Sequence, residues 1–299
     1  MSRVTLAQLE AFYWVASLGS VESAAQRLNL SQPTISLRLK ALEEEVGLLL
    51  FDRVGRGIRL SLDGQALLPN ARRILDNVQD FISDAGTSQV RGRIRVGMAE
   101  GFAFICLAPI LELLHKNYPE LQPECVIATS SSIEPDLHDH KLDLAFLVNA
   151  TERENFTLIP LGAQETGWVA PISWDLPETV SPQDLARLPI ICNPQGSINY
   201  WQVKSWFAAA GILPARLDTC SSVAMLAHLV SKGSALAIFP SKMVEVGLTA
   251  GRVRLLQASP RIEDVPIYAV FRADNQSAAL KAFIKTVHQV LAEMDYLHR

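Results

Sequence analysis

Hydrogen-bonding side chains gather on one side of the segment LNLSQPTISLRLKALE, which covers residues 28–43. If a helix begins after Ser31, a turn of about 100° per residue places Ile35, Leu39, Leu42 and Val46 on one apolar stripe. The candidate DNA contacts are Ser31 at the helix start and the residues of the opposite face and its flanks, which are Gln32, Pro33, Thr34, Ser36, Leu37, Arg38 and Lys40. Glutamine and serine can bond base edges, arginine can reach a phosphate or a guanine, and leucine can lie against a thymine methyl group. The segment therefore favours contact with double-stranded DNA over the alternative, the solvated face of an ordinary three-helix core.

A basic cluster follows this segment. Residues 47–53 and 58–60 are two short strand candidates around the glycine-rich tip VGRG. Arg53, Arg56 and Arg59 lie in or beside this tip. An arginine-bearing hairpin next to a candidate recognition helix favours contact with the DNA backbone or minor groove, and a solvated hairpin is the alternative.

Four short clusters in the last two hundred residues could hold a small ligand. Ligands of open α/β sheets sit beyond the carboxyl ends of strands, where helix N-termini present free N–H groups. We expect the clusters to converge on one cleft, although each serine could also be a simple helix cap. The clusters are Glu100, Gly101 and Phe102; Thr129 and Ser130; Ser197, Ile198 and Asn199; and Ser221 with Ser222.

Enzymatic and metal chemistry find little support in the sequence. The motifs GxSxG, GxGxxG and HExxH and a Walker loop do not occur in it. His138 and His140 are two residues apart, so on a helix they point in different directions. The four cysteines lack CxxC spacing, and we expect buried, reduced thiols. The expectation is a protein that is not an enzyme and has no cofactor and no metal.

Three helices must position the polar face of residues 28–43. Thr5 and Gln8 form a capping box for the first helix, and Ser20 can cap a short second helix. Ser31 can cap the third helix, whose first turn contains Pro33, where a missing N–H costs nothing. Two short helices joined by a tight turn predict a helix-turn-helix.

A longer helix is expected next, capped by Ser61 and running to about residue 85. Its apolar positions are spaced 4, 3, 4, 3 and 4 residues apart, which is a heptad pattern. Such a seam needs a partner helix, so it predicts dimerisation, and packing on the chain's own domain is the alternative. Residues 86–89 are expected to form a hinge. The seam residues are Leu67, Ala71, Ile74, Val78, Phe81 and Ala85.

From residue 94 onward, strand and helix patterns alternate, which predicts an α/β fold with largely parallel sheets. Arg91, Arg93 and Arg95 alternate at the start of the first strand, and we interpret them as a solvated strand end, with DNA contact as the alternative. The predicted strands are 94–99, 124–129, 142–148, 167–170, 189–192, 235–239 and 265–271, and the first two helices are 104–117 and 133–140.

Residues 28–64 resemble the LysR-type transcriptional regulators, through LNLSQPTISLRLKALEEEVG followed by LLLFDRVGRGIRLSLDG. The resemblance extends to VSKGSALAIFP at 230–240. It implies a winged helix-turn-helix DNA-binding domain at 1–60 and a linker and dimerisation helix with its hinge at 61–89. It further implies a two-lobed effector-binding domain at 90–299, with the type 2 fold of periplasmic solute-binding proteins. Lobe one would cover about 90–163 and 266–299, and lobe two about 164–265.

The resemblance also implies partners. These are promoter DNA, a small organic effector and further copies of the chain, as a homodimer or homotetramer, with RNA polymerase as another candidate. Effector-driven closure of the lobes would change the arrangement of the DNA-binding domains and the DNA bend. The first 95 residues carry 12 Lys and Arg against 10 Asp and Glu, while the remainder carries 15 against 21, which suggests separate partners for the two parts.

The expected location is the cytoplasm, with no membrane partner. The N-terminal residues MSRVTLAQLEAFYW lack the pattern of a secretory signal, and the apolar runs are shorter than a membrane span.

The chain departs from the family pattern at several positions. Many members carry arginine where this chain has Leu37, so the base preference there is open. The resemblance implies that Ser130 holds an effector carboxylate and that Ile198 lines the cleft. However, Val148 stands where some aromatic-acid sensors have arginine, and residues 99–102 lack the hydroxyl common on the first loop.

Glu100 therefore motivates a hypothesis about the effector. The ligand would carry an amine that faces Glu100, and Phe102 or Trp201 would supply an apolar wall. The alternative is an exposed glutamate without a partner.

Overall fold

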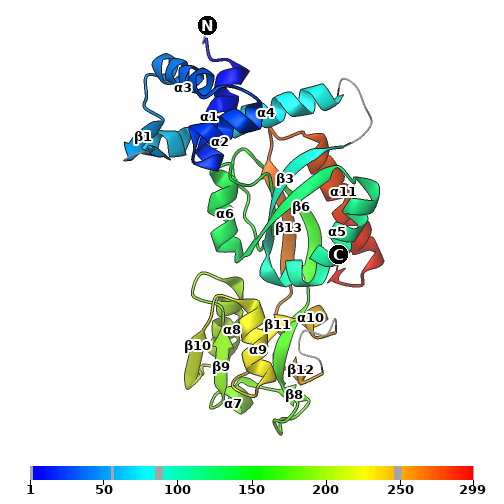
Figure 1. Ribbon diagram of the computed structural model, residues 1–299. Helices are drawn as coiled ribbons and strands as arrows, with labels where there is room; N and C mark the ends of the chain where they lie inside the picture. Colours follow the sequence, from blue (N-terminus) through cyan, green and yellow to red (C-terminus); the bar gives the residue numbers. More distant parts are fainter. Residues whose placement is uncertain (1–2, 55–56, 85–89, 246–250, 299) are drawn as a thin grey trace. The chain divides into compact units, whose positions relative to one another are not determined.

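The computed structural model describes residues 3–54, 57–84, 90–245 and 251–298 (Figure 1). The chain forms two compact units, one of residues 1–89 with 139–141 and one of residues 90–138 with 142–299. Within the described residues, none of the helices is both long and apolar enough to cross a membrane.

Three short helices build the core of the first unit, and their caps confirm the predicted boundaries. They are α1 (Leu6–Leu18), α2 (Val21–Leu28) and α3 (Gln32–Val46). Thr5 and Gln8 form the capping box of α1, and the hydroxyls of Ser20 and Ser31 accept from N–H groups in the first turns of α2 and α3. Asn29 adopts φ 53°, the left-handed conformation that makes the tight turn between α2 and α3.

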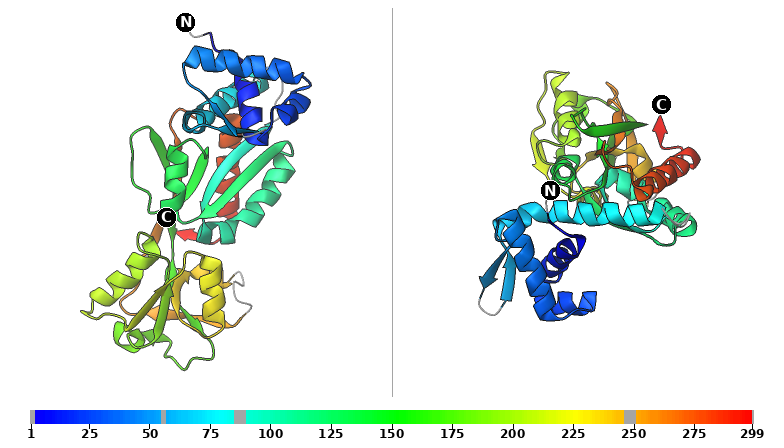
Figure 2. Two further views of the ribbon diagram at one scale, coloured as in Figure 1. Left: turned by 60° about the vertical axis from the view of Figure 1, so that its left-hand side comes forward. Right: turned by 90° about the horizontal axis from the view of Figure 1, so that it is seen from above.

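A hairpin and a long helix complete this unit. Strands β1 (Phe51–Val54) and β2 (Gly57–Leu60) pair antiparallel, so the predicted first strand began four residues too early. Helix α4 (Leu62–Asp84) then runs as one long helix from the hairpin (Figure 2). The Ser61 hydroxyl accepts from the N–H of Gly64 at 2.9 Å, as expected of a cap. A Cβ added at Gly64 would come within 2.1 Å of the Leu50 carbonyl oxygen, so only glycine permits this close approach.

The second unit contains two lobes, and lobe one is built on a six-stranded sheet of order β14-β6-β13-β5-β3-β4. Helices α5 and α11 pack together on one face, and α6 packs against β5 and β3 on the other (Figures 1 and 2). The strands are β3 (Gly92–Ala99), β4 (Leu121–Ala128), β5 (Leu144–Val148), β6 (Phe156–Gln164), β13 (Val265–Arg272) and β14 (Leu297–His298); the helices are α5 (Glu100–Asn117), α6 (Ser130–His138) and α11 (Ala278–Glu293).

Lobe two holds a four-stranded sheet of order β11-β7-β12-β8 and a parallel pair, β10-β9. Its core centres on Trp168, which packs edge-on against Trp206 with ring centroids 5.2 Å apart. The strands are β7 (Thr166–Pro171), β8 (Thr179–Val180), β9 (Pro189–Cys192), β10 (Arg216–Thr219), β11 (Ala237–Pro240) and β12 (Val253–Ala258); the helices are α7 (Pro182–Leu185), α8 (Ile198–Ala208), α9 (Val223–Ser231) and α10 (Ser241–Glu245).

The α/β class is confirmed, but the expectation of largely parallel sheets is wrong. Strands β3, β4 and β5 are parallel, whereas β13 runs antiparallel to both β5 and β6. In lobe two, β7 is antiparallel to β11 and β12. The reason is topological, because the chain leaves lobe one along β6 and returns along β13 to the middle of the same sheet.

Candidate DNA-binding face and ligand cleft

Helix α3 buries one stripe and exposes the other. Ile35, Leu39 and Leu42 are buried in the core of the first unit, as predicted, and Val46 is half-buried against it. The opposite face is solvent-exposed at Gln32, Pro33, Ser36, Leu37 and Lys40. Leu37 is 68% exposed in the middle of the helix. Single exposed leucines are common on proteins, but this one lies among groups that can bond DNA.

Other predicted contact residues of α3 are partly engaged within the unit. The hydroxyls of Ser31 and Thr34 lie 2.8 Å apart and bond each other. Arg38 is half-buried, and its guanidinium donates to the carbonyl of Ala7 on α1 at 3.4 Å. Lys40 pairs with Glu44 at 3.6 Å, but both side chains are exposed and water screens the pair, so Lys40 is freer than Arg38 to follow a DNA backbone.

The hairpin presents Arg59 to solvent on β2, in register with Asp52. Arg53 lies on β1 in register with Ile58. Arg56 lies outside the described residues. Glu43, on α3, accepts hydrogen bonds from the backbone N–H groups of Leu50 and Phe51, at 2.8 and 3.3 Å. The start of the hairpin is thus fixed to α3.

The expected seam on α4 divides into two parts. Leu67 and Ala71 pack in the core of the chain's own unit, and Ala71 is only 4% exposed. These two residues therefore pack within the chain's own domain, which was the alternative to dimerisation. Ile74 and Phe81 are 41% and 75% exposed, and Val78 lies half-buried between them. Ala85 and the proposed hinge at 86–89 lie outside the described residues.

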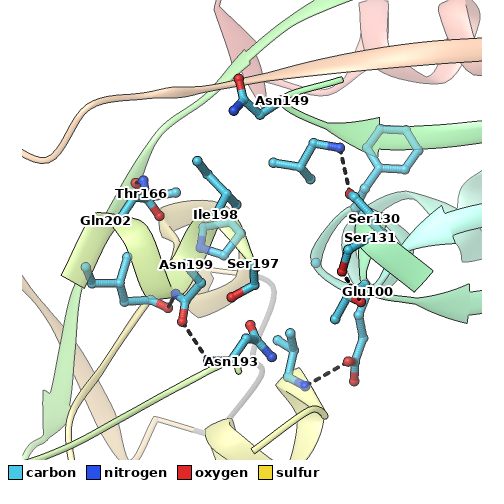
Figure 3. Close-up of a pocket in the computed structure, with 18 of the residues that line it drawn as sticks. Glu100, Ser130, Ser131, Asn149, Thr166, Asn193, Ser197, Ile198, Asn199 and Gln202 are labelled. Carbon is cyan, nitrogen blue, oxygen red and sulfur yellow. Dashed lines mark hydrogen bonds between the residues drawn. The ribbon is translucent and has the colours of Figure 1, made fainter. Parts of the chain in front are cut away.

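A cavity of about 340 Å³ opens between side chains of both lobes (Figure 3). Three of the four predicted effector clusters line the cavity in full: Glu100, Gly101 and Phe102; Thr129 and Ser130; and Ser197, Ile198 and Asn199. The fourth cluster, Ser221 and Ser222, does not line it. Lobe one contributes Glu100, Gly101, Phe102, Thr129, Ser130 and Ser131, and lobe two contributes Asn193, Ser197, Ile198, Asn199 and Gln202. The cavity has the size and the mixed polarity of a small-molecule site.

Hydrogen bonds fix the polar lining. The Ser130 hydroxyl accepts from the N–H of Val148 at 2.9 Å, which ties the start of α6 to the end of β5. Asn199 accepts from the N–H of Asn193 at 3.0 Å and donates to the carbonyl of Ile238 at 2.8 Å. These bonds hold the lining side chains in place before any ligand binds.

Several lining residues were not predicted. Ser131 continues a run of hydroxyls that the sequence displays plainly after Thr129. Thr166 and Gln202 bond each other at 2.7 Å and also line the cavity. No local pattern marks these two residues, because they are 36 residues apart in sequence and meet only when lobe two folds.

Glu100 is already hydrogen-bonded within the protein, which contradicts the alternative of a glutamate without a partner. Its carboxylate accepts from the Ser222 hydroxyl at 3.1 Å and from the N–H groups of Val223 and Ala224 at 2.8 and 3.0 Å. It is therefore not an unpaired glutamate, and the hypothesis of a ligand amine facing it stays a prediction. The physical reason is that the N-terminus of α9 offers N–H donors that lack partners within the helix.

Aromatic residues of both lobes line the cavity, among them Phe102 from lobe one and Trp201 from lobe two. Phe102 is fully buried and stacks on Phe146 with ring centroids 5.1 Å apart, so it supports the cavity from beneath. Trp201 is 51% exposed and also lines the cavity. Either aromatic can bound an apolar part of a ligand.

The prediction for Arg95 is wrong. Arg95 is 8% exposed, and its guanidinium donates to the carboxylate of Asp143 at 2.6 and 3.0 Å. Arg93 remains exposed and pairs with Glu124 at 3.1 Å, as a solvated strand end would. The difference arises because Arg95 points toward the loop before β5, which brings Asp143 against it.

The cysteines are free thiols. Burial raises the pKa of Cys106 to about 12 and that of Cys192 to about 11, and it also raises the pKa of Cys125. Because the thiolate is the reactive form, these three residues are poor nucleophiles. Among the described residues, no group of three or more His, Cys, Asp and Glu could hold a metal ion.

Family models match both units. Residues 6–65 match the bacterial regulatory helix-turn-helix protein of the lysR family, and residues 87–292 match the LysR substrate binding domain. The chain belongs to the LysR family of transcriptional regulators. It is a regulator with a helix-turn-helix DNA-binding domain and an effector-binding domain, and it is not an enzyme.

Curated relatives are similar along almost the whole chain. The transcriptional regulator CzcR of Bacillus anthracis is 24% identical over 288 residues, which is 95% of this chain and 97% of the relative. The regulator SoxR of Arthrobacter sp. is 25% identical over 282 residues, 93% of this chain and 95% of the relative.

Solved structures share the fold of this LysR-family chain. A full-length OxyR variant from Pseudomonas aeruginosa has a TM-score of 0.75 at 19% identity and covers 99% of this chain and 97% of its own. CbnR in complex with its target DNA has a TM-score of 0.66 at 23% identity, over 96% and 99% of the two chains.

Proposed function

We propose that this LysR-family regulator reads promoter DNA through the exposed face of α3, as an oligomer, and that a small organic ligand in the cleft controls the binding. The exposure of Leu37 carries the DNA part of the proposal. An apolar side chain that is 68% exposed beside Ser36 and Lys40 matches a surface that a thymine methyl group can cover.

The polar groups around Leu37 suit the two kinds of DNA contact. Gln32 and Ser36 are exposed near the helix start, where side chains reach base edges in the major groove. Lys40 and Arg59 are exposed cations, which suit phosphate contacts that position the protein without reading sequence. Arg53 and Arg56 are proposed backbone contacts on the sequence pattern alone.

The exposed part of the α4 seam supports a second copy of the chain as partner. Ile74 and Phe81 leave apolar surface in solvent, and the heptad spacing matches another helix. A two-fold dimer would place two recognition helices on two half-sites. A tetramer is the larger assembly that we propose for an extended promoter.

The cleft supports the regulatory part of the proposal. Its residues come from both lobes, so a ligand that contacts both favours one arrangement of the lobes over others. Such a population shift would alter the spacing of the DNA-binding units and the bend of the DNA. The proposal requires no bound cofactor. A regulator bound at a promoter would also be placed to contact RNA polymerase. Promoter binding also agrees with the expected cytoplasmic location.

Selection of binding sites from random DNA tests the role of α3. Replacement of Leu37 by arginine should change the preferred base at one position of each half-site, because arginine bonds guanine where leucine contacts a methyl group. The discrimination at that position should change by about 1–3 kcal/mol, roughly 5- to 150-fold in relative affinity.

Leu49 provides the matched control, since it is also 68% exposed in the same unit but lies outside α3. Leu49→Arg adds the same charge, so it should leave the selected sequence unchanged. If both variants select the wild-type site, Leu37 makes no base contact and this part of the proposal fails.

A further inference from the structure

The carboxylate of Glu100 bridges the two lobes. Glu100 is the first residue of α5 in lobe one, and its three hydrogen-bond donors belong to Ser222, Val223 and Ala224 in lobe two. The donors are 122 to 124 residues away in sequence. Figure 3 shows the Glu100 carboxylate turned toward the start of α9 at the edge of the cavity.

The start of α9 is a place where an anion is stabilised. The first N–H groups of a helix lack intrahelical acceptors, and the helix dipole makes this end positive. Glu100 accepts from the first two of these groups, on Val223 and Ala224, and the Ser222 hydroxyl accepts from the third, on Met225. All three donors are thus engaged by the chain itself.

The charges of the residues that line the cavity also disfavour an anionic ligand. Among the described residues that line the cavity, only Glu100 and Glu134 are ionisable. Glu134 pairs with Arg153 at 3.0 Å. The lining contains no lysine, arginine or histidine in the part of the chain that the structure describes. Its other polar groups are hydroxyls and amides, such as Thr129, Ser130 and Asn199.

We propose that Glu100 determines the specificity of the cleft: its carboxylate occupies the anion site at the start of α9 and excludes ligand anions from that end of the cavity. A ligand group next to α9 must then be uncharged or cationic. The inference rests on the proposed effector site for its biological meaning, but the occupancy of the anion site is a property of the free protein.

Chemical rescue tests this occupancy. Glu100→Ala removes the carboxylate and vacates the anion site, so free acetate should bind there in its place. With acetate replacing chloride at constant ionic strength, the Tm of Glu100→Ala should rise saturably toward the wild-type value, whereas the Tm of the wild-type protein should stay the same. Hydrogen exchange should show about tenfold less protection at Val223 and Ala224 in the variant, with protection regained in acetate.

Two further variants keep the outcome decisive. Glu134→Ala removes the other carboxylate of the lining, which pairs with the side chain of Arg153, and it should gain no response to acetate. Glu100→Gln preserves the side-chain volume, so it should fold even if Glu100→Ala does not. Its amide oxygen can accept from one of Val223 and Ala224, but its NH2 group cannot accept, so protection should fall at the other.

Three results would overturn the proposal. They are unchanged protection in both Glu100 variants, a destabilised Glu100→Ala that responds to acetate no more than to chloride, and an equal acetate response in wild type, Glu100→Ala and Glu134→Ala. None of the samples contains DNA or effector, so these results are independent of whether α3 reads a promoter.

Discussion

Arg93 and Arg95 stand two residues apart on β3, yet they have different energetic roles. The pair between Arg93 and Glu124 is exposed on both sides, with side chains 53% and 44% accessible, so water and salt screen it. Arg95 and Asp143 are 10% and 24% accessible and join through several hydrogen bonds. Removal of one partner there leaves a charge in a poorly hydrated place.

The residue-scale prediction compares these two pairs. Asp143→Ala should lower the free energy of unfolding by about 2–4 kcal/mol, because it leaves the Arg95 guanidinium buried without its carboxylate. Glu124→Ala should cost less than about 1 kcal/mol. Urea unfolding of both variants measures the difference, and equal losses would show that burial does not separate the two pairs.

Hydrogen bonds between residues close in sequence were predictable at this scale, and those between residues far apart in sequence were not. The caps at Thr5, Ser20 and Ser31 depend on neighbours three residues away, so the sequence displays both partners. The partners of Arg95 and Glu100 lie 48 and more than 120 residues away. Nothing in the residue types identifies those pairs before the fold brings them together.

At the scale of elements, α4 shows how one apolar stripe serves two purposes. Its first half packs on α1 and completes the core of the unit, and its second half leaves Phe81 in solvent. The heptad spacing alone could not separate the two halves. The division reflects geometry, because α4 is longer than the short helices that cover its beginning.

Loss of Phe81 tests the proposed partner helix. Phe81→Ser should weaken self-association by about tenfold or more, because an aromatic side chain loses its apolar burial in the dimer. Analytical ultracentrifugation measures the change. Leu62→Ser is the matched control, since Leu62 is 84% exposed on the same helix but lies off the heptad seam, and it should associate as the wild type does.

Elements with regular patterns were predicted, and irregular ones were missed. The buried run of β5 and the strand β9 stand out by composition. Strand β6 contains Pro160 and a glycine at φ 134°, both of which interrupt the usual strand pattern, and β10 is short and polar. These strands are stabilised by their neighbours in the sheets more than by their own residue preferences.

The whole molecule is acidic, with a formal net charge of −4, although it binds DNA. The excess of negative charge lies beyond residue 95, so the DNA must be held by a few cations of the first unit. In a two-fold dimer each of these cations acts twice. Association should therefore depend strongly on salt, because every phosphate contact releases counterions.

Arg59→Ala tests whether a cation of the first unit contacts phosphates in the assembled dimer. The variant should bind all DNA sequences more weakly by a similar factor, and the slope of log affinity against log salt should fall by about two, one for each copy in the dimer. Gel-shift titrations at several salt concentrations give the slope. A change in the selected sequence, with the slope unaltered, would show that Arg59 reads bases instead.

The position of β13 in the middle of the lobe-one sheet has a consequence for synthesis on the ribosome. The core of the first unit is complete after about the first quarter of the chain, whereas β13, between β6 and β5, emerges roughly 175 residues after the start of β3. At about 5–20 residues per second, that interval is on the order of ten seconds or more. A message cut short before residue 265 would yield a chain with a finished helix-turn-helix and an incomplete sensor. Such a product would compete for promoter sites without responding to the effector.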